Sequence, residues 1–209
     1  MIGPMGKLSF FVLALSFALV ATATALAQNS VPAGPRPAAY GPSYDVSFGY
    51  SYLTSTIPTS GRANLNGFDA AGRVDFSQHW GGTVDAGYVR TSNVLSTGNG
   101  GYDLTFLVGP VFYPVERGKL RVFLHGLVGA GVVDAAVPVN GTKYLHGWVV
   151  RPAYALGGGV ERSIVGPFGL RLSGDYLRTS FVNSAAVVQP QNNLRFTLSI
   201  VFRLNNRQP

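Results

Sequence analysis

Residues 43–52 read SYDVSFGYSY, a stretch in which large apolar side chains alternate with small or acidic ones. Successive side chains of a β-strand point to opposite faces, so this pattern predicts a strand with one apolar and one polar face. Apart from Asp45, the polar positions hold only Ser and Gly. The side chains on the polar face of this strand are therefore small.

The same alternation recurs in seven further segments up to residue 203. Each segment is about as long as a tilted strand needs to cross a bilayer, roughly 9–11 residues. Together the eight segments fill residues 43–204, which leaves no length in that range for a second domain. The further segments lie within 68–76, 84–88, 102–112, 121–130, 151–161, 168–176 and 194–203.

The connections between these segments alternate in length. Short ones are expected at 78–81, 114–119 and 163–167, and longer ones at 55–64, 92–100, 134–149 and 179–190. Short turns at one end and long loops at the other are typical of barrels that span a bacterial outer membrane. An even number of strands also brings both ends of the barrel to the short-turn side.

Three observations decide which face points inward. Acids and arginines share the polar-face positions, and the other polar-face residues are mostly Gly, Ala, Ser and Thr, which are small enough for a tight cylinder. Opposite charges suit a narrow lumen because an unpaired buried charge is costly. Aromatic residues gather near the strand ends, where a membrane protein meets the bilayer surface. The sequence therefore predicts an all-β fold, an eight-stranded antiparallel transmembrane up-and-down β-barrel with its apolar side outward.

Eight strands enclose a space that side chains can fill, so we expect a plugged, salt-bridged lumen. His125 is expected to meet Asp103 or Glu161 across strands. Pro110 removes one ladder donor and is expected to mark a bulge, and the glycines at 157–159 relieve crowding or bend the wall. The predicted lumen charge network consists of Asp45, Asp69, Arg73, Asp75, Asp85, Asp103, Arg121, His125, Glu161, Arg171, Asp175 and Arg195.

The two ends of the chain differ from this pattern. Residues 1–27 have a basic start, an apolar stretch and a final Ala-Leu-Ala, which predicts a signal peptide cleaved after Ala27 and export to the outer membrane. Residues 28–42 contain four prolines and are expected to form an extended periplasmic tether. Residues 205–209 are expected to be a short tail. The chain has no cysteine, so no disulfide framework is expected.

Residues 193–202 read NLRFTLSIVF and look like the aromatic-terminated last strand by which the barrel assembly machinery recognises its substrates. With this strand and the dyad pattern, the region from Ser43 to Leu204 resembles the small eight-stranded outer-membrane proteins of Gram-negative bacteria: the OmpA transmembrane domain, the OmpX-like barrels and the opacity proteins. The resemblance implies insertion by that machinery. It also raises a lipid A-modifying enzyme as an alternative, because such barrels exist at this size.

We expect a non-catalytic barrel with a structural or surface-interaction role carried by its outer loops. The chain lacks the His-x-Ser-Asn motif of the lipid A deacylases, its three histidines are far apart, and neither a metal, a cofactor nor a nucleic acid is expected. A narrow pore for small solutes is a further alternative. Cationic residues at the loop-side strand ends could bind phosphates of lipopolysaccharide, or could be ordinary solvated or snorkelling arginines. They are Arg62, Arg90, Lys143 and Arg178.

Overall fold

The structure is a computed structural model, and it describes residues 41–57, 61–92, 100–139, 143–182 and 188–204. Side chains are not described at 57, 61, 135–139, 143–149, 181–182 and 188–189. The chain divides into two units, Met1–Ala39 and Tyr40–Pro209, and every described residue belongs to the second. The predicted signal peptide (1–27), residues 28–40 of the predicted tether (28–42) and the predicted tail (205–209) lie outside the described residues.

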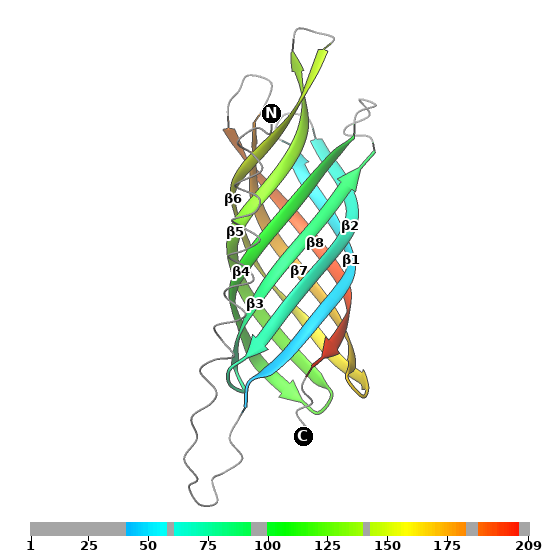
Figure 1. Ribbon diagram of the computed structural model, residues 1–209, viewed down its shortest axis with the longest axis vertical. Coiled ribbons are helices and arrows are strands. Elements are labelled where there is room, and N and C mark those ends of the chain that lie inside the picture. The colour runs from blue at the N-terminus through cyan, green and yellow to red at the C-terminus, as the bar shows by residue number, and fades with distance from the viewer. Residues whose placement is uncertain (1–40, 58–60, 93–99, 140–142, 183–187, 205–209) are drawn as a thin grey trace, which may run out of the picture. The chain divides into compact units, whose positions relative to one another are not determined.

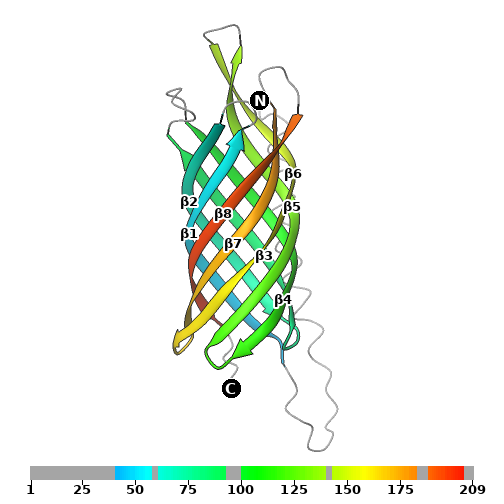
Figure 2. The same ribbon diagram turned by 180° about the vertical axis from the view of Figure 1, so that it is seen from behind.

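Eight antiparallel strands form a closed barrel in which each strand pairs with its neighbours in the sequence (Figures 1 and 2). The barrel closes where β1 pairs with β8, from Asp45↔Arg203 to Ser55↔Asn193. The predicted all-β, eight-stranded barrel fold is therefore confirmed. In the part of the chain that the structure describes, no helix is long and apolar enough to cross a membrane. The strands are β1 (Ser43–Ile57), β2 (Gly61–Asp75), β3 (Trp80–Thr91), β4 (Gly101–Arg117), β5 (Leu120–Val139), β6 (Lys143–Val165), β7 (Phe168–Val182) and β8 (Val188–Arg203).

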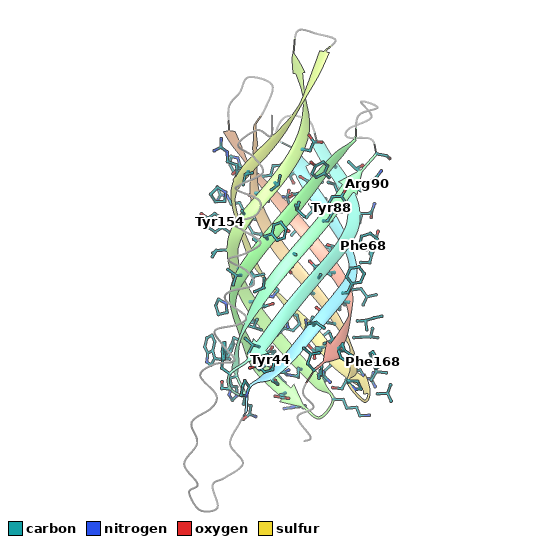
Figure 3. The ribbon with its side chains drawn as sticks, in the orientation of Figure 1. Tyr44, Phe68, Tyr88, Arg90, Tyr154 and Phe168 are labelled. Atoms are coloured by element: carbon teal, nitrogen blue, oxygen red, sulfur yellow. The ribbon has the colours of Figure 1, made fainter. Side chains whose placement is uncertain are left out.

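The wall of the barrel has an apolar outside and a largely polar inside. Phe48, Leu156 and Ile200 leave 60–71% of their surface exposed, whereas Asp175 and Arg195 are only 3% exposed. Figure 3 shows Phe68 and Tyr154 on the outer surface, with Tyr44 and Phe168 near the end where the chain enters β1. An apolar outer wall of this kind is stable in a bilayer and unstable in water.

The barrel has a turn end and a loop end. At the turn end, short turns join β2 to β3, β4 to β5 and β6 to β7, and Gly118 and Gly166 adopt left-handed φ values of 56° and 53° in two of them. Glycine tolerates this conformation without steric cost. The loop end carries the other connections.

Three of the four predicted long connections are mostly strand. The ladders continue to Ile57↔Gly61, Val139↔Lys143 and Val182↔Val188, so the predicted loops 55–64, 134–149 and 179–190 were wrong in extent. In β1, β2 and β8 the outer parts are rich in Ser, Thr and Asn, which lack the apolar alternation but pair through the backbone as other residues do. The β5–β6 hairpin is the longest and extends beyond the rest of the barrel (Figure 1).

The bulge predicted at Pro110 was misplaced. The β4–β5 register is the same on both sides of Pro110, at Val108↔Val128 and Val111↔His125, and it shifts only between Phe112 and Val115. The pairs at positions 109 and 110 are missing from that ladder, which fits the absent N–H of proline. A missing donor interrupts the hydrogen bonds without adding a residue, so the register survives.

Candidate functional site

The lumen holds three groups of side chains, and the first lies near the turn end around Arg171. Nη2 of Arg171 lies 2.9 Å from Oδ1 of Asp45 and 2.7 Å from Oε2 of Glu161, and Nη1 donates to Ser47. Arg203 binds the other oxygen of Glu161 at 2.5 Å. Each of these carboxylates is buried and paired, as stability of a buried charge requires.

Asp75 organises the neighbouring part of this group. Its Oδ2 lies 3.0 Å from Nη2 of Arg121, and its Oδ1 accepts a hydrogen bond of 2.7 Å from the Tyr113 hydroxyl. The guanidinium of Arg121 also stacks on the Tyr113 ring, 3.9 Å from its centroid. A hydrogen bond from a phenol and the charge of an arginine thus stabilise one buried aspartate from two sides.

Arg73 is held differently from the other lumen arginines. Its guanidinium lies over the Phe123 ring at 4.0 Å, and its Nε and Nη1 have no hydrogen-bond partner among the described residues. A cation over an aromatic face is attracted by the ring quadrupole. The Phe123 ring therefore contributes to holding the Arg73 guanidinium in the lumen.

The second group is centred on Arg195, whose guanidinium contacts three aspartates. Nη1 and Nη2 bind Asp85 at 2.8 and 3.2 Å, Nη1 also binds Asp69 at 3.1 Å, and Nε donates to Asp175 at 3.0 Å. These four residues come from β2, β3, β7 and β8. One side chain thus ties together half of the strands.

His125 belongs to this second group, because its Nε2 lies 2.7 Å from Oδ1 of Asp175. The expected partners Asp103 and Glu161 were wrong. His125 pairs with Gly157 on β6, and Gly157 pairs with Asp175 on β7. Because Gly157 has no side chain, the residues on either side of it meet over it.

The third group is aliphatic and was not predicted. It lies at inward positions among residues that sequence reasoning expected to be small or charged. In the sequence, a leucine at a polar-face position looks like an interruption of the alternation. The only signal that it points inward was its even or odd position relative to the other inward residues. The group consists of Leu53, Ala63, Leu65, Val89, Leu107, Leu127, Ala153, Ala155 and Leu177, none more than 7% exposed.

All twelve predicted network residues are buried inside the barrel. Ten of them form an ion pair with another of the twelve. Arg73 instead lies over the Phe123 ring, and Oδ1 of Asp103 has no hydrogen-bond partner in the described part of the chain. The cavity within the charged groups measures only about 10 Å³. That volume holds about one water molecule.

Other features of chemical interest lie apart from these three groups or at their edge. A groove of about 260 Å³ at the turn end lies between Gln78, His79 and residues 113–117. The described side chains include no cluster of three or more metal-ligating residues. Arg62, Arg90 and Arg178 are exposed near the loop end, while the side chain of Lys143 lies outside the described residues.

Comparison with known proteins identifies relatives by structure alone. No family model matches the chain, and no curated protein matches it in sequence. Among solved structures, the chain is similar to Ail, the attachment invasion locus protein of Yersinia pestis, in complex with the heparin analogue sucrose octasulfate. The two share 19% identity over 78% of this chain and 99% of Ail, with a TM-score of 0.56.

Neisserial surface protein A gives a second match. The identity is 12% over 78% of this chain and 98% of that protein, and the TM-score is 0.61. At these identities the likeness concerns the fold. The closed eight-stranded barrel with its apolar exterior therefore has the fold of the small eight-stranded outer-membrane β-barrels.

Proposed function

We propose that this protein is a non-catalytic barrel of the outer membrane with a closed lumen, and that it serves a structural or surface-interaction role through its loop end. The observation that carries the proposal is the filled interior. Two charged groups and an aliphatic group occupy the lumen, and the cavity among the charged side chains holds about one water molecule. A continuous aqueous path needs far more space than this.

The outer-membrane location is supported by the apolar outer wall and by the fold. Its partners would be outer-membrane lipids, including lipopolysaccharide, and the barrel assembly machinery during insertion. Ail, an attachment invasion locus protein, has the same fold, which fits a surface-interaction role. The long β5–β6 hairpin places the most protruding backbone of the barrel at that end.

The catalytic alternative has little support in the described residues. Nucleophilic catalysis needs a hydroxyl within hydrogen-bond reach of a base. The imidazole of His125 bonds to Asp175, and no described Ser or Thr hydroxyl is bonded to an imidazole. Incubating the purified barrel with lipid A and measuring acyl-chain mass would test this, and a change of acyl chains would overturn the non-catalytic role.

Conductance tests the closed lumen. In planar bilayers the wild-type protein should show no wide, stable conductance. Leu107→Ala shortens an inward side chain that is 2% exposed, and Leu156→Ala shortens an outward one that is 71% exposed. Only the first variant could raise conductance, and a large wild-type conductance would contradict the proposal. Heat-modifiable gel mobility of protein extracted from outer-membrane fractions tests the location.

A further inference from the structure

Two arginines on the outside of the wall, near the loop end, have the same neighbours. Arg90 pairs directly with Asn66 on one side and with Tyr102 on the other. Arg178 pairs with Asn192 on one side and with Tyr154 on the other. Directly paired residues of adjacent strands have Cβ atoms about 4.5–5.5 Å apart, so each guanidinium is within reach of both neighbours.

Each asparagine is also fixed by a second tyrosine. The Tyr50 hydroxyl donates to Oδ1 of Asn66 at 2.5 Å, and the Tyr176 hydroxyl donates to Oδ1 of Asn192 at 2.7 Å. With Oδ1 engaged, the amide presents its two N–H donors away from that tyrosine. The same set of two tyrosines, one arginine and one asparagine thus occurs twice, in the rows Tyr102–Arg90–Asn66 with Tyr50 and Tyr154–Arg178–Asn192 with Tyr176.

The arginine guanidinium and the asparagine amide of each row offer donors to a ligand. No acidic side chain among the described residues forms an ion pair with Arg90 or Arg178, and both arginines are exposed. A guanidinium beside an amide N–H₂ offers several donors and a positive charge, which matches the acceptor oxygens of a phosphate. Figure 3 shows Arg90 just beyond Tyr88 toward the loop end, with Tyr154 on another part of the wall.

We propose that these two rows bind the phosphate groups of lipid headgroups in the leaflet at the loop end of the barrel. The inference rests on the proposed outer-membrane location. Of the four cations that the sequence offered for lipopolysaccharide phosphates, it selects Arg90 and Arg178. Arg62 pairs with Thr56, and no such tyrosine–asparagine bond adjoins it among the described residues. A tyrosine on either side of each cation suits the bilayer surface, where aromatic rings and arginines anchor membrane proteins.

The two sites should differ in strength. Asp134 pairs with Tyr102, the tyrosine of the first row, and its carboxylate would weaken the attraction of a phosphate there. The tyrosine of the second row, Tyr154, pairs with Val128 on its other side. The row of Arg178 is therefore the stronger site.

The test titrates the purified barrel in detergent with three probes: diphosphoryl lipid A, dephosphorylated lipid A and inorganic phosphate. Bound lipid is counted by native mass spectrometry. Wild type should prefer the diphosphoryl lipid. Arg178→Gln should reduce that preference about tenfold, the effect of losing one charge-assisted hydrogen bond of about 1.4 kcal/mol. Asn192→Asp should reduce it at least as much, because the new carboxylate lies beside Arg178 and repels the phosphate. Each variant is first checked for heat-modifiable mobility, so that a folding defect is not taken for lost binding.

Tyr176→Phe distinguishes a phosphate-binding row from an arginine that only extends to the bilayer surface. It removes the hydroxyl that orients Asn192 without changing charge, and should reduce the preference about threefold, less than loss of a charge-assisted bond. Tyr44→Phe and Arg162→Gln, both on exposed residues toward the turn end, are the matched controls and should have no effect. Equal binding of the two lipids, or an unchanged Tyr176→Phe, would overturn the inference.

Two further outcomes separate the possible failures. Inorganic phosphate is added at the same concentration of phosphate groups as diphosphoryl lipid A. If it displaced the lipid, the sites would bind a free anion and the assignment to lipid headgroups would be overturned. If the protein fractionated away from the outer membrane, the proposed function would fail, whatever the lipid titration gave.

Discussion

Arg195 and Asp85 form a two-point ion pair across the lumen, with Nη1–Oδ1 at 2.8 Å and Nη2–Oδ2 at 3.2 Å. The two residues lie on β8 and β3, which are separated in the wall by β1 and β2. Such a pair fixes the distance between strands that share no backbone hydrogen bond.

Removing Arg195 should destabilise the barrel strongly. Arg195→Leu leaves three buried aspartates without their shared cation, and breaking a buried ion pair in this way costs about 3–5 kcal/mol. Urea unfolding in detergent or lipid vesicles measures the loss, with Arg162→Gln as the exposed control. A loss no larger than that of the control would show that the three aspartates do not depend on Arg195.

Charge placed on the outer wall should report the position of the bilayer. Phe68 is 57% exposed on the outside and lies midway along the barrel in Figure 3. Phe68→Arg should cost about 2–4 kcal/mol of unfolding free energy in a bilayer, whereas Trp80→Arg at the turn end should cost about 0–1 kcal/mol. Vesicle unfolding curves of both variants give the comparison. Equal costs would argue against a membrane-facing Phe68.

A methyl group at Gly157 should be poorly tolerated. Its Cβ would lie 2.9 Å from Cα of Asp175 and closer still to that residue's carboxylate, the partner of His125. Gly157→Ala should therefore destabilise by about 1–3 kcal/mol. Gly72 has open space at the same point, so Gly72→Ala should be neutral or stabilising by about 0.5–1 kcal/mol. The same unfolding assay measures both, and the reverse order would disprove the steric argument.

The aliphatic group should behave as a packed core. Leu127 is 2% exposed inside the lumen and Leu156 is 71% exposed outside it. Leu127→Ala should lose about 2–5 kcal/mol, because the rigid wall cannot collapse onto the cavity. Leu156→Ala, measured in detergent, is the matched control with a smaller loss. Similar losses would mean that the lumen is not tightly packed there.

The strands and the polarity of the wall were predictable because side-chain alternation is local and has a fixed period. The alternating residues next to Asp45 and Arg195 in the sequence are enough to predict that both side chains point inward. The pairing of His125 with Asp175 was not predictable, because it depends on the register of three strands and on the absence of a side chain at Gly157.

The outer-wall rows escaped sequence reasoning for a related reason. Arg90 and Arg178 were recognisable as cations near the loop end, but Asn66 and Asn192 looked like ordinary polar residues. Their amides stand out only through hydrogen bonds with Tyr50 and Tyr176 on the adjacent strand, each 16 residues away in the chain. No local pattern encodes a contact of that kind.

The described ion pairs of the lumen all join residues within strands. Substitutions in the connections at 58–60, 93–99, 140–142 and 183–187 remove none of them. Such a barrel can vary these connections in evolution, or accept a grafted epitope there in an experiment, while the ion pairs between its strands are retained.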